Sequence, residues 1–283
     1  MQILDGKLVA KEILDTVAVE VRSLTVPPRL VVVLVGDNPA SETYVRMKRK
    51  ACEQVGIVWE LIRLSAGDVT TESVIDLIHE LNQRDDVHGI LVQLPLPSHV
   101  YVPQVIKAID PYKDVDGFQA YNLGKMFLSE EFMDLSPCTP KGVLKILDHY
   151  NIDVKGMDAT VVGHSNVVGK PMSTMLLNRN ATVTTCHIDT KDLKSHTIGA
   201  DLLVVAVGKP GLVTADMVKD GAIVIDVGIN KLADGKLVGD VDFENVSKKA
   251  SYITPVPGGV GPMTVACLME NTLMAYKKNT VKK

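Results

Sequence analysis

The 283-residue sequence is poor in cysteine and has no apolar run long enough to cross a membrane. The cysteines are scattered, at Cys52, Cys138, Cys186 and Cys267. Without a Cys-x-x-Cys pair they suggest neither a zinc site nor a disulfide framework. The apolar run LVVVLVG at 30–36 has the length of a buried strand, not the roughly 20 residues of a membrane helix. No N-terminal stretch resembles a secretory signal, so we expect a soluble protein of a reducing compartment, the cytoplasm.

The sequence also lacks an excess of positive charge. Its net charge is −4, with 23% charged and 46% hydrophobic residues, which is ordinary for a globular protein. We therefore expect neither nucleic acid nor an anionic membrane as a partner. The basic terminal KKNTVKK is interpreted as a solvated chain end.

Segments of helical periodicity alternate with short apolar runs along the whole chain. Such alternation predicts parallel sheets with both faces covered by helices. In the first half we predict helices over Leu4–Leu24, 41–56 and 71–82, and strands over Leu30–Val35, Val58–Leu64 and the start of GILVQLPLP. In the second half we predict a helix at TPKGVLKILDHY, strands over Ala159–Val162, Thr182–Cys186, Leu202–Val205 and Ala222–Val227, and helices near Gly169 and from Pro262. The segment 111–140 lacks periodicity and is predicted to be a loop at a domain boundary.

Lys48 falls on the apolar face of the predicted helix SETYVRMKRKACEQVG (41–56). On a helical wheel it lies about 40° from Tyr44, whereas Arg49 and Lys50 lie on the opposite side. A lysine in this position can extend its amine to water. It can instead line a cleft and transfer protons, with Tyr44 stacking on a planar ligand. The wheel leaves both interpretations open.

The stretch ATVVGHSNVVGKP (159–171) has the order strand, glycine turn and helix start. Gly163 can form the tight turn, Ser165 can donate to a phosphate, and Gly169 permits close helix packing. The spacing departs from the GxGxxG fingerprint, so a ligand-free turn is the alternative. Asp189, about 20 residues past Gly169, can bind a ribose 2′-hydroxyl or can begin a helix as its N-cap.

Three further stretches combine polar residues with turns. Gln93 in VQLPLP either faces a ligand at the carboxyl edge of a sheet or caps the strand end. Asp114 and Asp116 in KDVDGF indicate a turn, and we expect no metal because no further ligands follow in register. The loop TPVPGGVGPMT (254–264) either approaches a ligand with bare backbone or crosses rigidly between domains.

Together these stretches resemble the bifunctional methylenetetrahydrofolate dehydrogenase/methenyltetrahydrofolate cyclohydrolase family. The likeness runs through ILDGK, VGDNPAS, YVRMK, GILVQLPLP, DVDGF, PCTPKG, VVGHSNVVGKP, VIDVGIN, GDVDF and ITPVPGGVGPMT. It implies an α/β protein of two domains with a cleft between them. The implied N-terminal αβα domain (1–138 plus 263–283) binds folate, and the implied C-terminal Rossmann-like domain (139–262) binds the dinucleotide. The resemblance also implies a homodimer.

The same resemblance assigns roles to individual residues. The catalytic positions match Tyr44, Lys48, Gln93 and Asp116. The substrate-binding set adds Val92, Leu94, Pro257, Gly258, Gly259, Val260 and Gly261. The cofactor-binding positions match Gly163, His164, Ser165, Val168, Gly169, Ile188, Asp189 and Ile229.

Two of these positions depart from the family pattern. The family usually has arginine at His164 and often serine at Ile188, and both help to hold the 2′-phosphate of NADP. Here a titratable cation and an apolar side chain replace them, and Asp189 would repel the phosphate. The family implies NADP as the cofactor, and these replacements leave NAD open.

The implied activity belongs to one-carbon metabolism, which also serves purine biosynthesis. The enzyme would oxidise 5,10-methylenetetrahydrofolate to 5,10-methenyltetrahydrofolate with NADP or NAD, and then hydrolyse it to 10-formyltetrahydrofolate. The alternatives are a dehydrogenase without the second activity and a non-catalytic nucleotide-sensing module. The joint presence of Tyr44, Lys48 and Gln93 argues against the first alternative.

Overall fold

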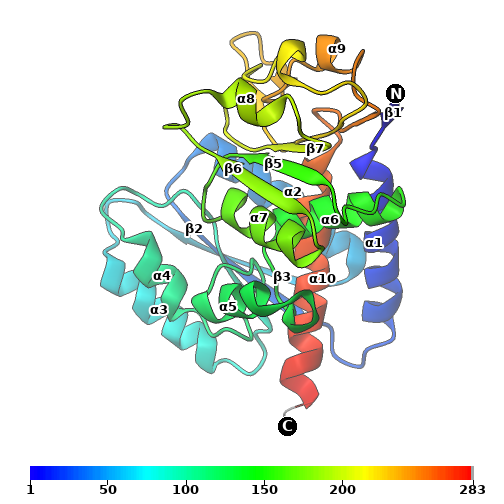
Figure 1. Cartoon of the computed structure of the whole chain (residues 1–283). Coiled ribbons are helices and arrows are strands. Elements are labelled where there is room, and N and C mark those ends of the chain that lie inside the picture. Colours follow the sequence, from blue (N-terminus) through cyan, green and yellow to red (C-terminus); the bar gives the residue numbers. More distant parts are fainter. Residues whose placement is uncertain (282–283) are drawn as a thin grey trace. The chain divides into compact units, whose positions relative to one another are not determined.

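The computed structural model describes residues 1–281, which form two compact units (Figure 1). Unit 1 comprises Met1–Ala10, Met126–Phe132 and Thr139–Thr264, and unit 2 comprises Lys11–Lys125, Met133–Cys138 and residues 265–281. The units therefore interleave along the sequence more than the two predicted domains do. Among residues 1–281, no helix is both long and apolar enough to span a bilayer.

Unit 2 is built on a three-stranded parallel sheet. The strand order is β3-β2-β4, with β2 at Arg29–Val35, β3 at Val58–Leu64 and β4 at Gly89–Val92. Its helices include α2 (Pro39–Val55), α3 (Thr71–Gln83), α4 (Val102–Ala108) and most of α5 (Ala120–Leu128). The helices α1 (Gly6–Arg22) and α10 (Val260–Val281) contribute most of their residues to unit 2 and the remainder to unit 1.

Both faces of this sheet are covered by helices. Successive side chains of a strand point to opposite faces. Leu30 and Val32 accordingly pack in a buried cluster with residues of α1, α2 and α10. Val31 and Val33 pack in a second cluster with residues of α3 and α4. This three-layer arrangement confirms the predicted αβα architecture and explains why β2 is apolar throughout.

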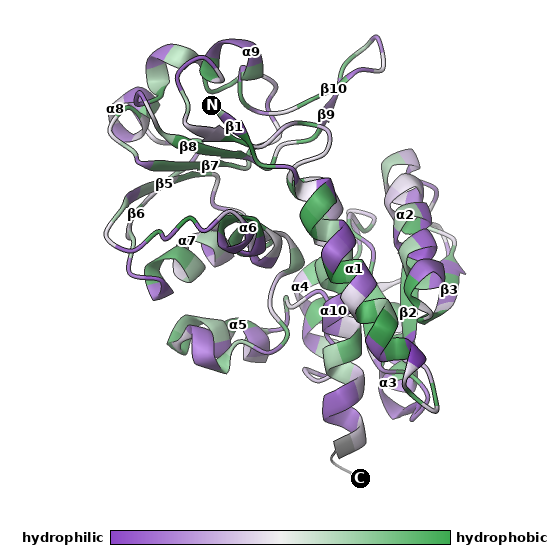
Figure 2. Cartoon of the chain, turned by 90° about the vertical axis from the view of Figure 1, so that its right-hand side faces the viewer, coloured by the Kyte–Doolittle hydropathy of each residue, from purple (hydrophilic) through white to green (hydrophobic). Residues whose placement is uncertain are grey.

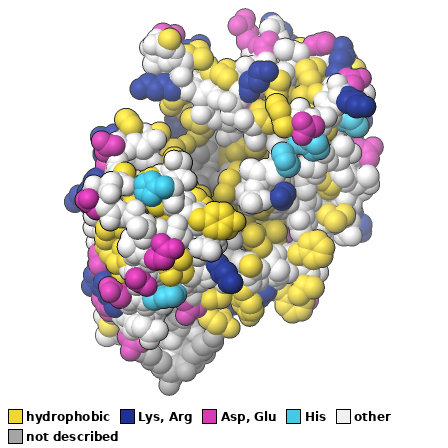
Figure 3. Space-filling model, turned by 90° about the vertical axis from the view of Figure 1, so that its left-hand side faces the viewer, with side chains coloured by type: hydrophobic (Ala, Val, Ile, Leu, Met, Phe, Trp, Pro, Cys, Tyr) yellow, Lys and Arg dark blue, Asp and Glu magenta, His cyan; other side chains and the backbone are white. Residues whose placement is uncertain are grey.

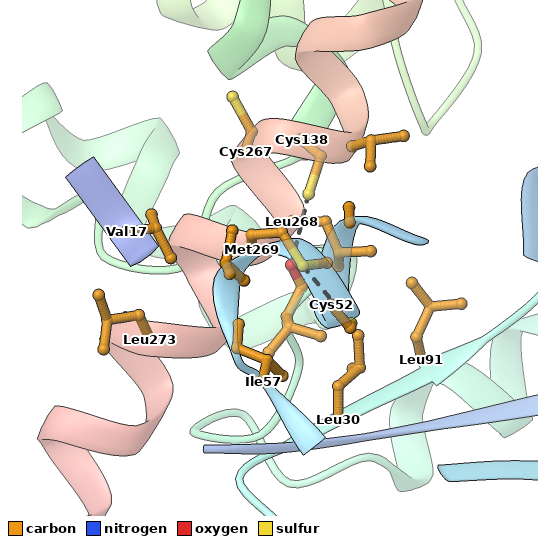
Figure 4. Close-up of a cluster of buried hydrophobic side chains, with 14 of the residues drawn as sticks. Val17, Leu30, Cys52, Ile57, Leu91, Cys138, Cys267, Leu268, Met269 and Leu273 are labelled. Carbon is orange, nitrogen blue, oxygen red and sulfur yellow. Dashed lines mark hydrogen bonds between the residues drawn. The ribbon is translucent and has the colours of Figure 1, made fainter. Parts of the chain in front are cut away.

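Two of the cysteines help to fill the first of these clusters. Figure 4 shows Cys52 and Cys138 among Leu30 of β2 and Leu268 and Met269 of α10. Burial raises the pKa of the Cys52 thiol to about 12, so it stays protonated at neutral pH. All four cysteines are buried thiols outside any disulfide, and they pack as small side chains.

Unit 1 is built on a six-stranded parallel sheet in the order β1-β11-β8-β7-β5-β6. The strands are β1 (Gln2–Ile3), β5 (Asp158–Val162), β6 (Thr182–Cys186), β7 (Leu202–Val205), β8 (Ile223–Asp226) and β11 (Tyr252–Ile253). Figure 2 shows β7 and β8 as strongly apolar, as expected for strands buried on both faces.

Helices and a short hairpin complete unit 1. They are η1 (Glu130–Phe132), α6 (Cys138–His149), α7 (Gly169–Asn178), α8 (Leu193–Thr197), η2 (Ala215–Met217), α9 (Phe243–Val246) and the antiparallel pair β9 (Asn230–Lys231) and β10 (Leu237–Val238). After β5, the chain adds β6 on one side and β7 on the other. The strand order therefore reverses at β5, and doubly wound sheets bind ligands at the carboxyl ends of the strands around such a point.

Several predicted elements match the structure, and one prediction is wrong. The strands at Val58–Leu64, Thr182–Cys186 and Leu202–Val205 have the predicted bounds. The segment 111–140 is not a continuous loop, because it contains α5 and η1. The helix α5 is only nine residues long, has Gly124 in its interior and ends in the exposed Phe127 and Leu128, so its sequence is too short to establish a period.

Candidate functional site

Lys48 lies on the buried face of α2. The helix begins after Asn38, whose side chain accepts hydrogen bonds from the amides of Ala40 and Ser41. This cap fixes where the helix begins, and on the helix Lys48 is only 7% exposed. Its Nζ donates a hydrogen bond to Gln93 Oε1 at 3.0 Å. The amine therefore does not extend into bulk water, and that interpretation of the helical wheel is wrong.

Gln93 follows β4 and is held in one orientation. Its backbone N–H donates to the carbonyl oxygen of Val33 at 2.9 Å, and its side-chain Nε2 donates to the carbonyl oxygen of Leu94 at 2.7 Å. Because Nε2 is used in this way, Oε1 is the atom directed at Lys48. Val92 ends β4 and Leu94 follows Gln93, so both lie at the carboxyl end of the strand.

Asp116 and Tyr44 complete the group in unit 2. Desolvation raises the pKa of the Asp116 carboxyl, while the nearby Lys48 ammonium and the Cys138 thiol oppose that rise. Tyr44, one turn before Lys48 on α2, is half-buried, and burial raises the pKa of its hydroxyl. The phenol therefore remains a hydrogen-bond donor at neutral pH. The amine of Lys48 thus lies near the amide of Gln93 and the carboxyl of Asp116, with the phenol of Tyr44 one turn away on the same helix, and such groups suit proton transfer and recognition of N–H groups.

The glycine loop Pro257–Gly261 belongs to unit 1 and is closely packed there. Gly258 has a φ of +112°. A Cβ on Gly6 would lie 1.8 Å from the Gly259 carbonyl oxygen, and Lys7 donates its amide hydrogen to Gly258. A Cβ on Gly261 would lie 3.2 Å from the side chain of Ile229. The loop is therefore held by the N-terminal residues and lies beside a predicted cofactor position.

The turn after β5 has the geometry of a dinucleotide site. Gly163 has a φ of +119°, and a Cβ there would lie 2.3 Å from the Ala206 carbonyl oxygen. A Cβ on Gly169 would lie 2.0 Å from the carbonyl oxygen of Gly163. Ser165 Oγ accepts from the Val168 amide at 3.1 Å, which leaves its hydroxyl hydrogen to donate elsewhere. The tight turn and the start of α7 fit a bound pyrophosphate.

A second histidine, missed in the sequence, stands beside His164. The rings of His164 and His187 have centroids 4.9 Å apart. Both residues follow the carboxyl ends of the paired strands β5 and β6, and this adjacency could have predicted their proximity. Asp189 Oδ2 lies 3.8 Å from His187 Nδ1, and Ile188 is 91% exposed.

The structure also shows that Asp189 does not cap the next helix, α8. The carboxylate that caps α8 belongs to Asp192, which accepts from the amide of Ser195. The alternative interpretation of Asp189 as a helix N-cap is therefore wrong. Its exposed carboxylate lies near His187, and its predicted contact with a ribose stays a prediction.

Two buried aspartates hold the loops after β7 and β8, and the sequence did not identify them as functional. Asp226 accepts from the amides of Gly228, Asp240 and Val241, each at 3.0 Å. Asp240 accepts from the amides of Val207 and Gly208 and from Asn230 Nδ2. The two carboxylates therefore hold the Gly228 amide before Ile229, the Asn230 side chain after it, and the backbone that follows β7.

We expect the stabilising role of Asp226 to depend on pH. Burial raises the pKa of its carboxyl from 3.8 to about 6. Between these values the folded state holds a proton that the unfolded state has lost, so the contribution of Asp226 to stability falls as pH rises through this window. In urea unfolding, the loss caused by Asp226→Asn should be about 2 to 3 kcal/mol larger at pH 4 than at pH 7. If Asp226→Asn lowers the free energy of unfolding equally at pH 4 and pH 7, the raised pKa of Asp226 is contradicted.

Charge is mixed on at least one face of the molecule. Figure 3 shows one face on which acidic and basic side chains are interspersed with apolar ones. A face that binds nucleic acid would gather lysine and arginine. Within residues 1–281, no three or more His, Cys, Asp or Glu side chains are grouped so as to hold a metal ion.

Comparison with known proteins relates the whole chain to one family. Residues 4–116 match the catalytic domain, and residues 137–280 match the NAD(P)-binding domain, of tetrahydrofolate dehydrogenase/cyclohydrolase. The chain is 55% identical over 280 residues to the bifunctional protein FolD of Nautilia profundicola, with 98% of each chain covered.

Solved structures agree with this relationship. The bifunctional enzyme FolD from Campylobacter jejuni, a methylenetetrahydrofolate dehydrogenase/cyclohydrolase, superposes with a TM-score of 0.95 at 52% identity, covering 98% of this chain and 99% of that one. The N5,N10-methylenetetrahydrofolate dehydrogenase-cyclohydrolase of Trypanosoma brucei, solved with NADP and an inhibitor, has a TM-score of 0.95 at 38% identity, covering 99% and 98%.

Proposed function

This chain belongs to the tetrahydrofolate dehydrogenase/cyclohydrolase family, and we propose that Lys48, Gln93, Asp116 and Tyr44 carry out the chemistry of that family here. The enzyme oxidises 5,10-methylenetetrahydrofolate to the 5,10-methenyl form and then hydrolyses this product to 10-formyltetrahydrofolate. The observation that supports these residues most strongly is the buried hydrogen bond from Lys48 Nζ to Gln93 Oε1, next to the carboxyl of Asp116.

Asp116 anchors the folate in this proposal. A carboxylate offers two acceptor oxygens, which match adjacent amino and ring N–H groups such as those of a pterin. Its environment is partly desolvated, which strengthens such hydrogen bonds. Tyr44 retains its proton and can stack its ring on the planar ligand. These contacts place the one-carbon unit near Lys48.

Lys48 moves protons during hydrolysis. Water adds to the methenyl carbon, the bond from that carbon to the ring nitrogen breaks, and that nitrogen gains a proton. The water molecule loses two protons in forming the formyl group, of which one goes to the nitrogen and one to solvent. Lys48 Nζ assists these transfers, and Gln93 holds the amine in position through Oε1. Proton transfer needs hydrogen-bond distance, so a Lys48 amine held in one position transfers protons more efficiently than a mobile one.

The nicotinamide dinucleotide, when bound, supplies the hydride acceptor for the oxidation. The residues that fit it lie in unit 1. The turn from Gly163 to Ser165 and the amides at the start of α7 hold the pyrophosphate. Val168 and Gly169 allow the turn to close, and Ile229 provides an apolar contact, whereas the neighbouring glycine loop Pro257–Gly261 belongs to the predicted folate-binding set.

We infer NADP as the preferred cofactor, with a moderate preference over NAD. The ring N–H groups of His164 and His187 lie close enough together to donate hydrogen bonds to one 2′-phosphate, at the position where the family usually has arginine. Asp189 beside them opposes the 2′-phosphate, and the exposed Ile188 offers it no hydrogen bond. The balance favours NADP by less than about a hundredfold in kcat/KM, or roughly 2.7 kcal/mol.

Initial rates with NADP and NAD at matched concentrations test this inference. Asp189→Asn should raise the ratio of the two kcat/KM values by about fivefold, because it removes a charge whose repulsion is worth roughly 1 kcal/mol. His164→Arg should raise the ratio further. The exposed His79 of α3 offers a control, since His79→Arg adds the same charge in unit 2. A wild-type preference above a hundredfold, or no response to Asp189→Asn, would show that Asp189 has no influence.

Three properties remain predictions from the family. They are the homodimer, the cytoplasmic location, and the supply of one-carbon units to purine biosynthesis. Sedimentation at micromolar concentration tests the first, because a dimer has twice the mass of the 30.7 kDa chain.

A further inference from the structure

We propose that Asp114 and Asn271 are positioning residues for folate binding, because together they pin the backbone on both sides of Asp116. We call the two side chains, with Gly117, the Asp116 cradle. This inference rests on the proposed role of Asp116. All the residues concerned lie in unit 2.

Asp114 organises the chain after Asp116. It is 1% exposed, and its Oδ1 accepts from the amide of Gly117 at 3.2 Å. Its Oδ2 accepts from the amide of Gln119 and from Asn122 Nδ2, at 2.8 and 2.9 Å. The residue also bridges to Ile90 of β4, so the loop is tied to the edge of the sheet. These hydrogen bonds therefore hold residues 114–119 in a turn around the Asp114 carboxylate.

Asn271 fixes the chain before Asp116 from a distant part of the sequence. It lies on α10 and is completely buried. Its Nδ2 donates to the carbonyl oxygens of Val115 and Ser136, both at 2.9 Å. The Cys138 thiol donates to the same Val115 oxygen at 3.4 Å. One amide group thus joins the residue next to Asp116 to the segment that precedes α6.

Gly117 shows how closely these two segments approach each other. Its φ is +77°, and a Cβ there would lie 2.4 Å from the carbonyl carbon of Ser136 and 2.6 Å from the Pro137 nitrogen. Only glycine fits this conformation and this distance. The backbone on both sides of Asp116 is therefore held by specific contacts, whereas the sequence Asp-Gly alone indicates only a turn.

A pinned backbone reduces the cost of binding. A carboxylate that is already oriented loses little conformational entropy when it accepts hydrogen bonds from a ligand. Loss of the Asn271 amide would leave two buried carbonyl groups without this donor and would let the loop relax. The expected result is weaker folate binding with unchanged cofactor binding, since the cradle lies within unit 2 and the cofactor turn within unit 1.

A double-mutant cycle in the full chain separates positioning from general destabilisation. Asn271→Leu should raise the dissociation constant of tetrahydrofolate by about tenfold or more, with the KM for NADP unchanged. In an Asp116→Asn background, the same substitution should have almost no further effect, because the side chain that it positions no longer provides the anchor. The adjacent Thr272 provides the control: it is equally buried, and its hydroxyl donates to the Leu268 carbonyl of its own helix. Thr272→Val should leave folate affinity unchanged.

The outcomes distinguish this inference from the proposed function. If Asp116→Asn leaves folate affinity unchanged, the proposed anchor itself fails. Two results would contradict the cradle alone, provided that Asp116→Asn itself binds folate weakly. In the first, Asn271→Leu leaves folate affinity unchanged; in the second, it weakens folate binding as much in the Asp116→Asn background as in the wild type. Asp114→Asn is the milder second variant, since it keeps an oxygen for Gln119 and Asn122 and loses the bond to Gly117. If Asn271→Leu does not fold, the same double-mutant cycle with Asp114→Asn tests the inference instead.

Discussion

Replacing Lys48 with methionine is expected to lower hydrolysis of 5,10-methenyltetrahydrofolate by about 10³-fold while the folate still binds. Methionine has a similar length and fills the same buried space, but it has no proton to give and no site to take one. Gln93 Oε1 loses its partner at the same time. The measurement is the decay of the methenyl compound, alongside its dissociation constant.

Lys50 provides the matched control for this substitution. It lies on the same helix, two residues away, and its side chain is exposed. Lys50→Met should leave hydrolysis within about twofold of wild type, as surface substitutions away from a site usually have small effects. Normal hydrolysis by Lys48→Met would remove the lysine from the mechanism. A non-catalytic nucleotide-sensing protein would instead reduce no cofactor when methylenetetrahydrofolate is added to the wild type.

Replacing Asp116 with alanine is expected to raise the dissociation constant of folate by about 30- to 100-fold. Hydrogen bonds to a charged group contribute roughly 1.5 to 3 kcal/mol, and the pterin would lose its partner for adjacent N–H groups. The exposed Asp76 of α3 is a suitable control, because Asp76→Ala removes the same charge from the surface of unit 2. An unchanged folate dissociation constant in Asp116→Ala would contradict the anchor.

The pH dependence of folate affinity provides a second test of Asp116. Desolvation raises the pKa of this carboxyl, so the group holds its proton to a higher pH than an exposed aspartate does. Only the ionised form accepts with both oxygens. Affinity in the wild type should therefore fall as pH is lowered through the raised pKa. Asp116→Asn should lack this response, because an amide does not titrate in the same range.

Sequence patterns predicted the regular parts of the fold well. Apolar strands such as Leu202–Val205 are recognisable because a strand buried on both faces must be apolar throughout. The helix around Lys48 is recognisable from its period of 3.6 residues. The short helices α4 and α5 were missed, since they are too short to establish a period. The strand β1 was missed because only its pairing with β11 makes its two residues a strand.

The site was predictable only in part, because its residues are joined by contacts between distant parts of the sequence. The helical wheel placed Lys48 on the buried face, but its partner Gln93 is 45 residues away and no local pattern joins them. Asn271 is 156 residues from Val115, and its role depends on where α10 packs. His187 required knowledge of which strands are neighbours. Residues that act through long-range contacts become visible once the fold is known.

The most direct test of the central claim is a crystal structure of the full chain with a folate and the dinucleotide bound. The account predicts that Lys48 Nζ keeps its bond to Gln93 and lies within about 4 Å of the folate one-carbon unit, with the Asp116 carboxylate on the pterin N–H groups. A folate bound away from Lys48, with the amine in contact only with protein atoms, would contradict it.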